Sequence, residues 1–232
     1  ETISDAYGER KSASDILARA EEEIFRISQE RSDRDLRAIS GIVGEAFEKI
    51  QEMSMKGGGL TGVTTGYQDL DRELSGLQAS DLVLLAARPS MGKTALGINI
   101  ATNAAIRAKA KVAIFSLEMS DLQLSQRIIS SLSHVDLKKI ISGQIAADEW
   151  EIIAEAASAM RELPIYIDDT AGITVSEMRA KCRRMKLERG LDLVVIDYLQ
   201  LMASDGRNEN RQQEISAISR GLKALAKELQ VP

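Results

Sequence analysis

Cysteine, histidine, aromatic residues and long apolar runs are all scarce in this chain of 232 residues, and each scarcity excludes a class of protein. The single cysteine, Cys182, cannot form a disulfide within the chain, which fits a reducing cytosol. The single histidine, His134, has no cluster of metal ligands around it in the sequence. No apolar run approaches the roughly 18 residues of a membrane span, and we expect no signal peptide. The sequence therefore predicts a cytoplasmic protein without a membrane partner.

Composition also limits the core and the partners. Aromatic residues make up only 3% of the chain, so we expect an aliphatic core, and a hydrophobic content of 44% is enough to build one. The length allows one large domain, or one domain with an appendage. The formal net charge of −5 gives no overall attraction for nucleic acid. Contact with DNA or RNA must therefore come from a local basic surface.

Residues 1–59 have the pattern of a helical linker region. Apolar residues recur at three- and four-residue steps over about 12–29 and again over about 36–56, which predicts two amphipathic helices. Three glycines, 57–59, end the second helix and supply a flexible joint. The helix over 12–29 must bury its apolar stripe, either on its own domain or on a neighbouring subunit.

Residues 60–232 have the pattern of an α/β domain. Short apolar runs bounded by polar or turn residues predict strands, and the longer amphipathic segments between them predict helices. This alternation predicts a mainly parallel sheet flanked by helices, which binds its ligands at the carboxyl ends of the strands. The predicted strands cover about 82–86, 112–117, 165–167 and 191–196.

One loop in this domain has the sequence of a phosphate-binding loop. It follows the predicted strand at 82–86, ends in Gly92-Lys93-Thr94 and precedes a predicted helix over about 94–109. The backbone N–H groups of such a loop accept an anion, while Lys93 reaches the β- and γ-phosphates and the Thr94 hydroxyl suits Mg²⁺. The alternative is a strand–turn–helix junction in which Lys-Thr occurs by chance. The residues predicted to bind ATP are Ala87, Arg88, Pro89, Ser90, Met91, Gly92, Lys93, Thr94 and Ala95.

Three carboxylates, Glu118, Asp168 and Asp197, follow directly on predicted strands, at the same edge of the sheet as this loop, and two of them are candidates for catalysis. Asp197 can hold the water shell of Mg²⁺, although it can also be an ordinary residue of a strand-to-loop turn. Glu118 can orient the water that attacks a γ-phosphate. Alternatively, it is only an acid whose negative charge interacts favourably with the dipole of the next helix. We predict that Thr94 and Asp197 bind the metal, and that Glu118 and Lys93 are catalytic.

Other polar residues permit further hypotheses. Gln200 is a candidate for sensing the γ-phosphate or for contacting nucleic acid. The polar loop after it is a candidate for tracking a phosphate backbone, through Arg207, Asn208, Asn210 and Arg211. Asp168 and Asp169 are expected to shape a turn, and the basic helix that follows them is expected to be mostly a solvated face.

Four segments together resemble the bacterial replicative DNA helicases of the DnaB type. Ala87, in place of the loop's usual first glycine, is common in that family, and the resemblance runs from about Ser12 to the end of the chain. The four segments are Gly62-Val63-Thr64-Thr65-Gly66, Arg88-Pro89-Ser90-Met91-Gly92-Lys93-Thr94, Phe115-Ser116-Leu117-Glu118-Met119-Ser120 and Ile196-Asp197-Tyr198-Leu199-Gln200-Leu201-Met202.

The resemblance implies a RecA-like P-loop ATPase core that hydrolyses ATP with Mg²⁺. It implies a homohexamer, held by the helix over 12–29 packing on the adjacent subunit, that encircles single-stranded DNA and unwinds duplex DNA 5′-to-3′. The implied partners are the primase, a helicase loader and replication fork proteins, and the implied location is the nucleoid of a bacterial cytoplasm. By position it assigns Lys93 and Thr94 to nucleotide and Mg²⁺, Glu118 to water activation and Asp197 to Mg²⁺.

Both ends of the sequence look cut from something longer, since the chain starts without Met and stops at Pro232 directly after a predicted helix. By the resemblance, the ATPase domain over 60–232 is incomplete at its C-terminus and lacks an arginine finger, so we expect nucleotide binding with poor hydrolysis. Two alternatives stay open. One is a RecA-like recombinase or related DNA-dependent ATPase, and the other is an assembly module that nucleotide holds together without unwinding.

Overall fold

The computed structural model describes residues 38–55, 59–88, 90–204 and 210–232, in two compact units that divide after Gly58. In the first unit, helix α3 (Ile39–Met55) forms where the pattern at 36–56 predicts it. The helix predicted at 12–29 lies outside the described residues. The apolar stripe of α3 is exposed, which fits a segment that packs on a further surface. Its exposed members include Ile39, Val43, Phe47 and Ile50.

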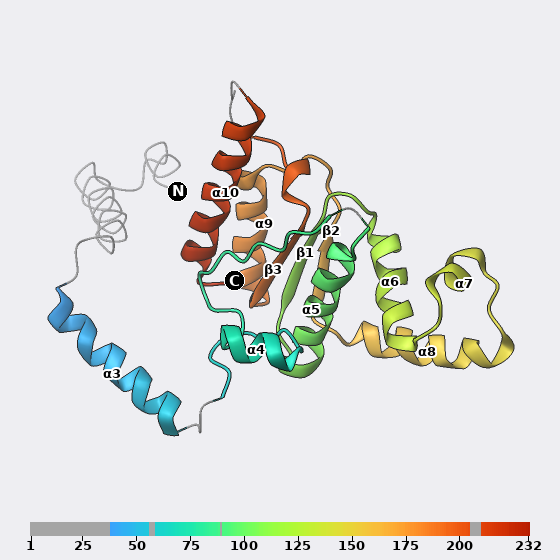
Figure 1. Ribbon diagram of the computed structural model, residues 1–232, viewed down its shortest axis with the longest axis horizontal. Helices are drawn as coiled ribbons and strands as arrows, with labels where there is room; N and C mark the ends of the chain where they lie inside the picture. Colours follow the sequence, from blue (N-terminus) through green and yellow to red (C-terminus); the bar gives the residue numbers. More distant parts are fainter. Residues whose placement is uncertain (1–37, 56–58, 89, 205–209) are drawn as a thin grey trace, which may run out of the picture. The chain divides into compact units, whose positions relative to one another are not determined.

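The second unit is built around a parallel sheet whose strands lie in the order β2-β1-β3 (Figure 1). The strands are β1 (Val112–Ser116), β2 (Ile165–Asp168) and β3 (Leu193–Asp197). Val112 lies opposite Ile165 on one side and Leu193 on the other, and both ladders run parallel. The carboxyl ends of all three strands therefore meet at one edge, which confirms the predicted sheet.

Helices cover both faces of this sheet (Figure 1). Helices α5 (Lys93–Ala108) and α6 (Asp121–Ser133) pack on one face, and α9 (Val175–Glu188) and α10 (Arg211–Leu229) pack on the other. Within the described residues, every helix is too short or too polar to cross a lipid bilayer. The remaining elements are α4 (Gln68–Leu74), α7 (Leu137–Ser142), α8 (Ala147–Arg161) and the 3₁₀ turn η1 (Leu199–Leu201).

Each face of the sheet has its own aliphatic core, because side chains alternate along a strand. Val112 and Ile114 of β1 pack toward α5 and α6, whereas Ala113 and Phe115 pack toward α9 and α10. On α5 the residues against the sheet are small, and three alanines there are completely buried: Ala101, Ala104 and Ala105. Small residues let this helix approach closely, which brings its N-terminus to the edge where the strands end.

Two helices that follow strands begin at capping boxes. The Ser120 hydroxyl accepts the Gln123 N–H at 3.3 Å, and the Gln123 side chain accepts the Ser120 N–H at 3.2 Å. Thr174 and Glu177 make the same reciprocal pair at the start of α9. These side chains satisfy N–H groups that a helix leaves unpaired, and so they fix where α6 and α9 begin.

The prediction of a strand at 82–86 is wrong. Residues 82–88 belong to no ladder, and Val83, Leu84 and Leu85 are exposed. A strand persists only where its N–H and C=O groups pair with a neighbour. On the side of β3 away from β1, the Val194 N–H donates to the carbonyl of Pro232 at 3.0 Å. Pro232 therefore borders β3 at Val194, and residues 82–88 pair with none of the described strands.

The carboxylate of Asp71 in α4 organises the turn before that helix. It accepts the Thr64 hydroxyl at 2.5 Å, and the Thr65 N–H and hydroxyl at 2.7 Å each. The carbonyl of Thr65 in turn accepts the side-chain amide of Asn103 on α5 at 3.2 Å. This turn therefore ties α4 to α5, the helix that follows the predicted phosphate loop.

We expect Asp71→Ala to lower the free energy of unfolding by about 3 kcal/mol, because it leaves the buried donors of Thr65 without an acceptor. Chemical denaturation measures this difference. Asp69→Ala is the matched control on the same helix, since the Asp69 side chain is 91% exposed and pairs with Arg72 at the surface. It should cost less than about 0.5 kcal/mol. Equal losses in the two variants would contradict this role of Asp71.

The same carboxylate predicts a pH dependence of stability. Burial favours the neutral acid, but hydrogen bonds from Thr64, Thr65 and Gly66 outweigh it and hold the pKa of Asp71 below its usual 3.8. A pKa that is lower in the folded state gives stabilisation that is present above the unfolded pKa and lost as the pH falls through the folded pKa. The difference in unfolding free energy between the wild-type chain and Asp71→Ala should therefore shrink below pH ~4. A difference that stays constant into strong acid would argue against this shift.

Candidate active site

The predicted phosphate loop lies at the N-terminus of α5. Gly92 caps the helix with a φ of 82°, a left-handed conformation that suits glycine. A Cβ built on Gly92 would have nothing within 4 Å, so the space before the helix end is open. The Met91 N–H donates to the carbonyl of Arg88 at 3.2 Å and closes a tight turn, while Pro89 lies outside the described residues. The first N–H groups of a helix have no partner within it, so this open end can take an anion.

Three of the predicted residues converge at the end of β3. The Thr94 hydroxyl donates to Asp197 Oδ2 at 2.7 Å, across 103 positions of sequence. The Lys93 Nζ lies 3.3 Å from Asp197 Oδ1. Asp197 is only 8% exposed, so its charge is balanced by these two neighbours and not by bulk water. The structure thus brings a hydroxyl, an ammonium and a carboxylate to the N-terminus of one helix.

Tyr198 belongs to the same group, although the sequence analysis assigned it no role. The Lys93 Nζ lies 4.1 Å from the centroid of the Tyr198 ring. Tyr198 is half-buried and follows Asp197 through a cis peptide bond. Its position next to a strand-end carboxylate is the signal that could have found it, since neighbours of such a residue stay within reach of the same ligand.

Glu118 lies at the same edge, at the end of the neighbouring strand β1. The Leu117 N–H donates to the carbonyl of Asp197 at 2.6 Å, so the residue before Glu118 is bonded to the backbone of the site. The Ser116 hydroxyl donates to the carbonyl of Met119 at 2.7 Å and closes the turn around Glu118. The Glu118 side chain is exposed there, as a group that acts on a water molecule would need to be.

The described part of the candidate DNA loop starts helix α10. The Asn210 side chain accepts the Gln213 N–H at 2.9 Å and caps this helix. The Arg211 guanidinium donates to Glu214 at 2.5 Å and to the carbonyl of Gln200. The Gln200 side chain itself is exposed. Arg207 and Asn208 lie outside the described residues, so contact between this loop and DNA stays a prediction.

The acidic pair after β2 has structural partners. Asp168 pairs with Lys181 of α9, and although its burial favours the neutral form, hydrogen bonds from Lys181 and Thr170 lower the pKa of Asp168. Asp169 accepts the Asp121 N–H at 3.2 Å, at the start of α6. These contacts agree with a role of the pair in shaping the chain after the strand.

The expectation that the basic helix α9 is mostly a solvated face holds only in part. Lys181 is held by Asp168, and Arg179 and Arg183 both pair with Glu228 of α10. Several of its cations therefore fasten α9 to its neighbours. Arg183, although paired, and Arg184 are both exposed.

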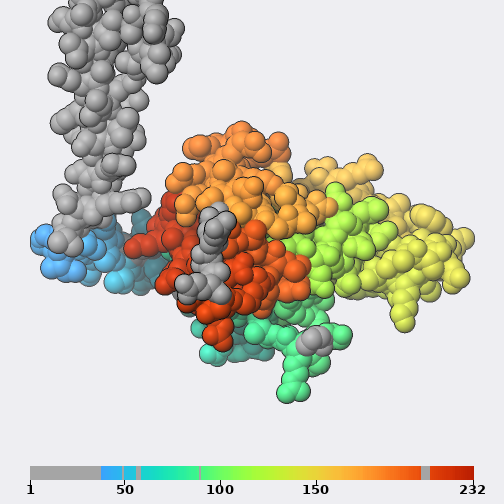
Figure 2. All heavy atoms as spheres, turned by 90° about the horizontal axis from the view of Figure 1, so that it is seen from above, coloured from blue at the N-terminus to red at the C-terminus, as the bar shows by residue number. Residues whose placement is uncertain are grey.

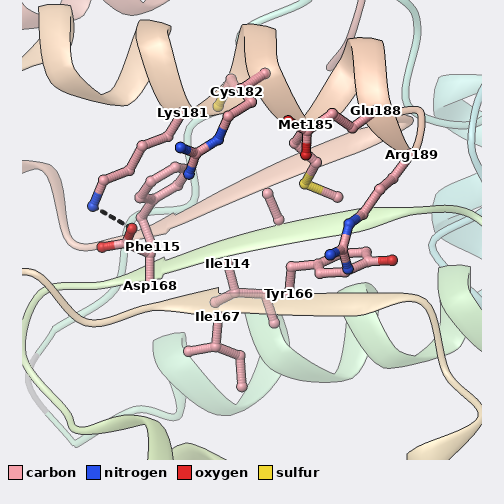
Figure 3. A pocket seen from close by; sticks show the side chains of 12 residues that line it. Ile114, Phe115, Tyr166, Ile167, Asp168, Lys181, Cys182, Met185, Glu188 and Arg189 are labelled. Atoms are coloured by element: carbon pink, nitrogen blue, oxygen red, sulfur yellow. Dashed lines mark hydrogen bonds and ion pairs between the residues drawn. The ribbon is translucent and has the colours of Figure 1, made fainter.

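A hollow of about 370 Å³ lies between α9 and strands β1 and β2, and its lining includes none of Lys93, Thr94, Glu118 and Asp197 (Figure 3). In it the Arg189 guanidinium lies 5.1 Å from the centroid of the Tyr166 ring, and the Lys181–Asp168 pair closes one end. Burial raises the pKa of the Cys182 thiol in its wall to about 12, which makes the thiol unreactive. The hollow has no phosphate loop, so it is not the site predicted from the sequence.

The group at the end of β3 fits a magnesium nucleotide. The Thr94 hydroxyl and the Asp197 carboxylate offer the hard oxygen ligands that Mg²⁺ prefers, beside a helix end that accepts anions. Among the described residues, no cluster of three or more His, Cys, Asp or Glu could hold an ion by itself. A metal here therefore needs further oxygen ligands, which a phosphate would bring.

A predicted phosphate loop at a helix N-terminus, with strand-end carboxylates on a parallel α/β sheet, is typical of P-loop ATPase cores, the class to which RecA-like ATPases belong. A family model described as "DnaB-like helicase C terminal domain" matches residues 62–232. The chain belongs to this family.

Individual relatives agree with this assignment. The chain is 42% identical over 229 residues to the replicative DNA helicase DnaC of Bacillus subtilis (strain 168), and 44% identical over 229 residues to the replicative DNA helicase DnaB of Geobacillus stearothermophilus. Each match covers 98% of this chain and 50% of the relative. The chain thus spans about half the length of these relatives.

Two solved structures share the fold. One, described as an ATPase domain, superposes with a TM-score of 0.79 at 34% identity, over 85% of this chain and 69% of that one. The other, a DnaB-like replicative helicase described with its interactions with primase, superposes with a TM-score of 0.76 at 33% identity, over 93% of this chain and 52% of that one.

Proposed function

We propose that this chain is the motor part of an ATP-driven replicative DNA helicase that uses Mg²⁺. The observation that carries the proposal is the convergence of Lys93, Thr94 and Asp197 at the open N-terminus of α5. The relatives of this chain are named replicative DNA helicases, which supports DNA unwinding as the process that ATP hydrolysis drives.

In this proposal the loop over 87–95 binds the triphosphate, and Lys93 contacts its β- and γ-phosphates. Thr94 and Asp197 bind the metal, which neutralises negative charge on the phosphates. Glu118 orients the attacking water from the end of β1 and accepts its proton. Each group lies on a rigid element, at the N-terminus of α5 or at the end of a strand, so little reorganisation is needed when the phosphates arrive.

We propose that Gln200 senses the γ-phosphate or contacts DNA, and that the loop with Arg207, Asn208, Asn210 and Arg211 contacts single-stranded DNA. Support comes from the hydrogen bond of Arg211 to the carbonyl of Gln200, three residues after Asp197. This bond joins the segment that follows the metal carboxylate to the start of α10. A change at the nucleotide can thereby reach the loop that tracks DNA.

The assembly that we propose is a homohexamer, in which 60–232 is the ATPase domain and 1–59 the linker region. In Figure 2 the atoms of α7 and α8, coloured yellow, project as a lobe from the rest of their unit. Exposed apolar side chains on this lobe and on α6 offer a surface that the linker helix over 12–29 of a neighbouring subunit could cover. They are Leu122, Ile141, Trp150 and Ile152.

The further partners that we propose are the primase, a helicase loader and replication fork proteins, and the place of action is the nucleoid in a bacterial cytoplasm. One solved relative is described with its interactions with primase, which supports the first of these partners.

A forked-duplex assay tests the function. With ATP and Mg²⁺ we expect a protein of its relatives' full length that contains this chain to unwind a duplex with a 5′ single-stranded tail, and not a duplex with only a 3′ tail. DNA should also stimulate phosphate release. Strand exchange without unwinding would favour a recombinase instead. A ring that nucleotide stabilises, with no phosphate release stimulated by DNA, would favour an assembly module.

A further inference from the structure

We propose that Tyr198 is a positioning residue for Lys93, and that its ring holds the ammonium where the phosphates of a nucleotide bind. This inference rests on the nucleotide site of the proposed function. It concerns a residue that neither the phosphate-loop motif nor the strand-end carboxylates include.

The geometry places the ammonium between two groups from consecutive residues. The Lys93 Nζ lies 4.1 Å from the Tyr198 ring centroid and 3.3 Å from Asp197 Oδ1. The Lys93 side chain is 29% exposed, so it is partly removed from water. A cation over an aromatic face is attracted by the ring quadrupole, and this attraction grows as water is excluded.

The two contacts differ in what they leave free. An ammonium has three N–H donors, and a carboxylate takes up at least one of them. An aromatic face attracts the cation through its π-system, so the remaining donors can still bond phosphate oxygens. The ring also restricts a four-carbon side chain whose rotamer freedom would otherwise be lost on binding. Tyr198 therefore prepares Lys93 for the nucleotide without competing for its donors.

The chain offers a matched control in Tyr166. This tyrosine is also half-buried and also carries a cation, since Arg189 lies 5.1 Å from its ring centroid. It lies on β2, which is separated from β3 by β1. The same substitution at Tyr166 removes an equivalent contact far from the phosphate loop.

Titration of the purified full chain with a fluorescent ATP analogue and Mg²⁺ tests the proposal. Tyr198→Leu should raise the dissociation constant about three- to ten-fold, and Tyr198→Phe should change it less than about two-fold because the ring remains. Tyr166→Leu should leave it unchanged. In a Lys93→Ala background, Tyr198→Leu should have no further effect, since the ring acts through the ammonium. Thermal unfolding checks that each variant folds. If Tyr198→Leu does not fold, Tyr198→Met serves as a second non-aromatic variant.

Unchanged or tighter binding by Tyr198→Leu would overturn the proposal. So would an equal loss in Tyr198→Phe, or a loss that persists without Lys93. If Lys93→Ala itself bound the analogue as tightly as the wild-type chain, the nucleotide site would fail, and the role of Tyr198 with it. A failure confined to Tyr198 would leave that site standing.

Discussion

In a protein of its relatives' full length that contains this chain, Lys93→Ala is expected to lower ATP turnover stimulated by DNA by about 10²- to 10³-fold and to weaken nucleotide binding. The Lys93 ammonium lies at the N-terminus of α5, 3.3 Å from Asp197. Its removal takes a positive charge from the place where phosphate charge develops, inside a partly dehydrated group of residues. Phosphate release in the presence of single-stranded DNA measures the first effect, and titration with a fluorescent nucleotide measures the second.

The control for this variant is Arg107→Ala. Arg107 is also a cation on α5, but it is exposed in the last turn, at the opposite end of the helix. It should change turnover less than about two-fold. If the two variants behaved alike, the N-terminus of α5 would not be the phosphate site. A ring of Lys93→Ala that falls apart only without nucleotide would instead support the assembly module.

In the same full-length protein, Glu118→Gln is expected to lower turnover by about 10²- to 10⁴-fold while nucleotide binding stays near that of the wild type. Glutamine keeps the shape of the side chain but cannot take a proton from water. Glu118 lies one strand away from Asp197, and the backbone of its neighbour Leu117 bonds to the site. The separation of turnover from binding is therefore the diagnostic result, and both are measured on the same preparation.

Asp169→Asn provides the comparison for this second variant. Asp169 is likewise an exposed acid just beyond a strand, but its carboxylate accepts the Asp121 N–H at the start of α6. We expect turnover within about two-fold of the wild-type value. Glu118→Gln with normal turnover would show that another group activates the water.

Much of this fold follows from local signals in the sequence. Helices α6 and α9 begin at the serine and threonine of their capping boxes, because those side chains satisfy N–H groups within the same turn. Helix α10 spans Arg211–Leu229, Asn210 caps it, and its buried residues Ile218, Leu222, Leu225 and Leu229 recur at three- and four-residue steps. Signals of this kind depend on neighbours three or four residues away, so the sequence alone carries them.

The wrong prediction of a strand at 82–86 arose because strand pairing depends on distant residues and not on local ones. An apolar run shows that a segment can form a strand, but pairing depends on a partner that is distant in the sequence. On the side of β3 away from β1 the Val194 N–H bonds to Pro232, a contact that no local pattern predicts. The strands whose partners are present, β1, β2 and β3, all formed near their expected places.

The residues of the candidate site likewise fall into those that the sequence could predict and those that it could not. The rule that ligands bind at the carboxyl ends of parallel strands was enough to select Asp197 and Glu118, because topology alone sets where strands end. It could not predict that Tyr198 lies over Lys93, since that contact depends on the side-chain conformations of residues 105 positions apart. Nor could it predict that Glu228 holds two arginines of α9, about 45 positions away.

The central claim is that one magnesium-bound triphosphate binds at the N-terminus of α5, between Lys93, Thr94 and Asp197. A crystal structure with a non-hydrolysable ATP analogue and Mn²⁺ tests it most directly, because the anomalous signal of Mn²⁺ locates the ion. The account predicts that signal beside the Thr94 hydroxyl and the Asp197 carboxylate, with the terminal phosphates at Lys93. An analogue seated in the hollow between α9 and β2, or Mn²⁺ away from Asp197, would contradict it.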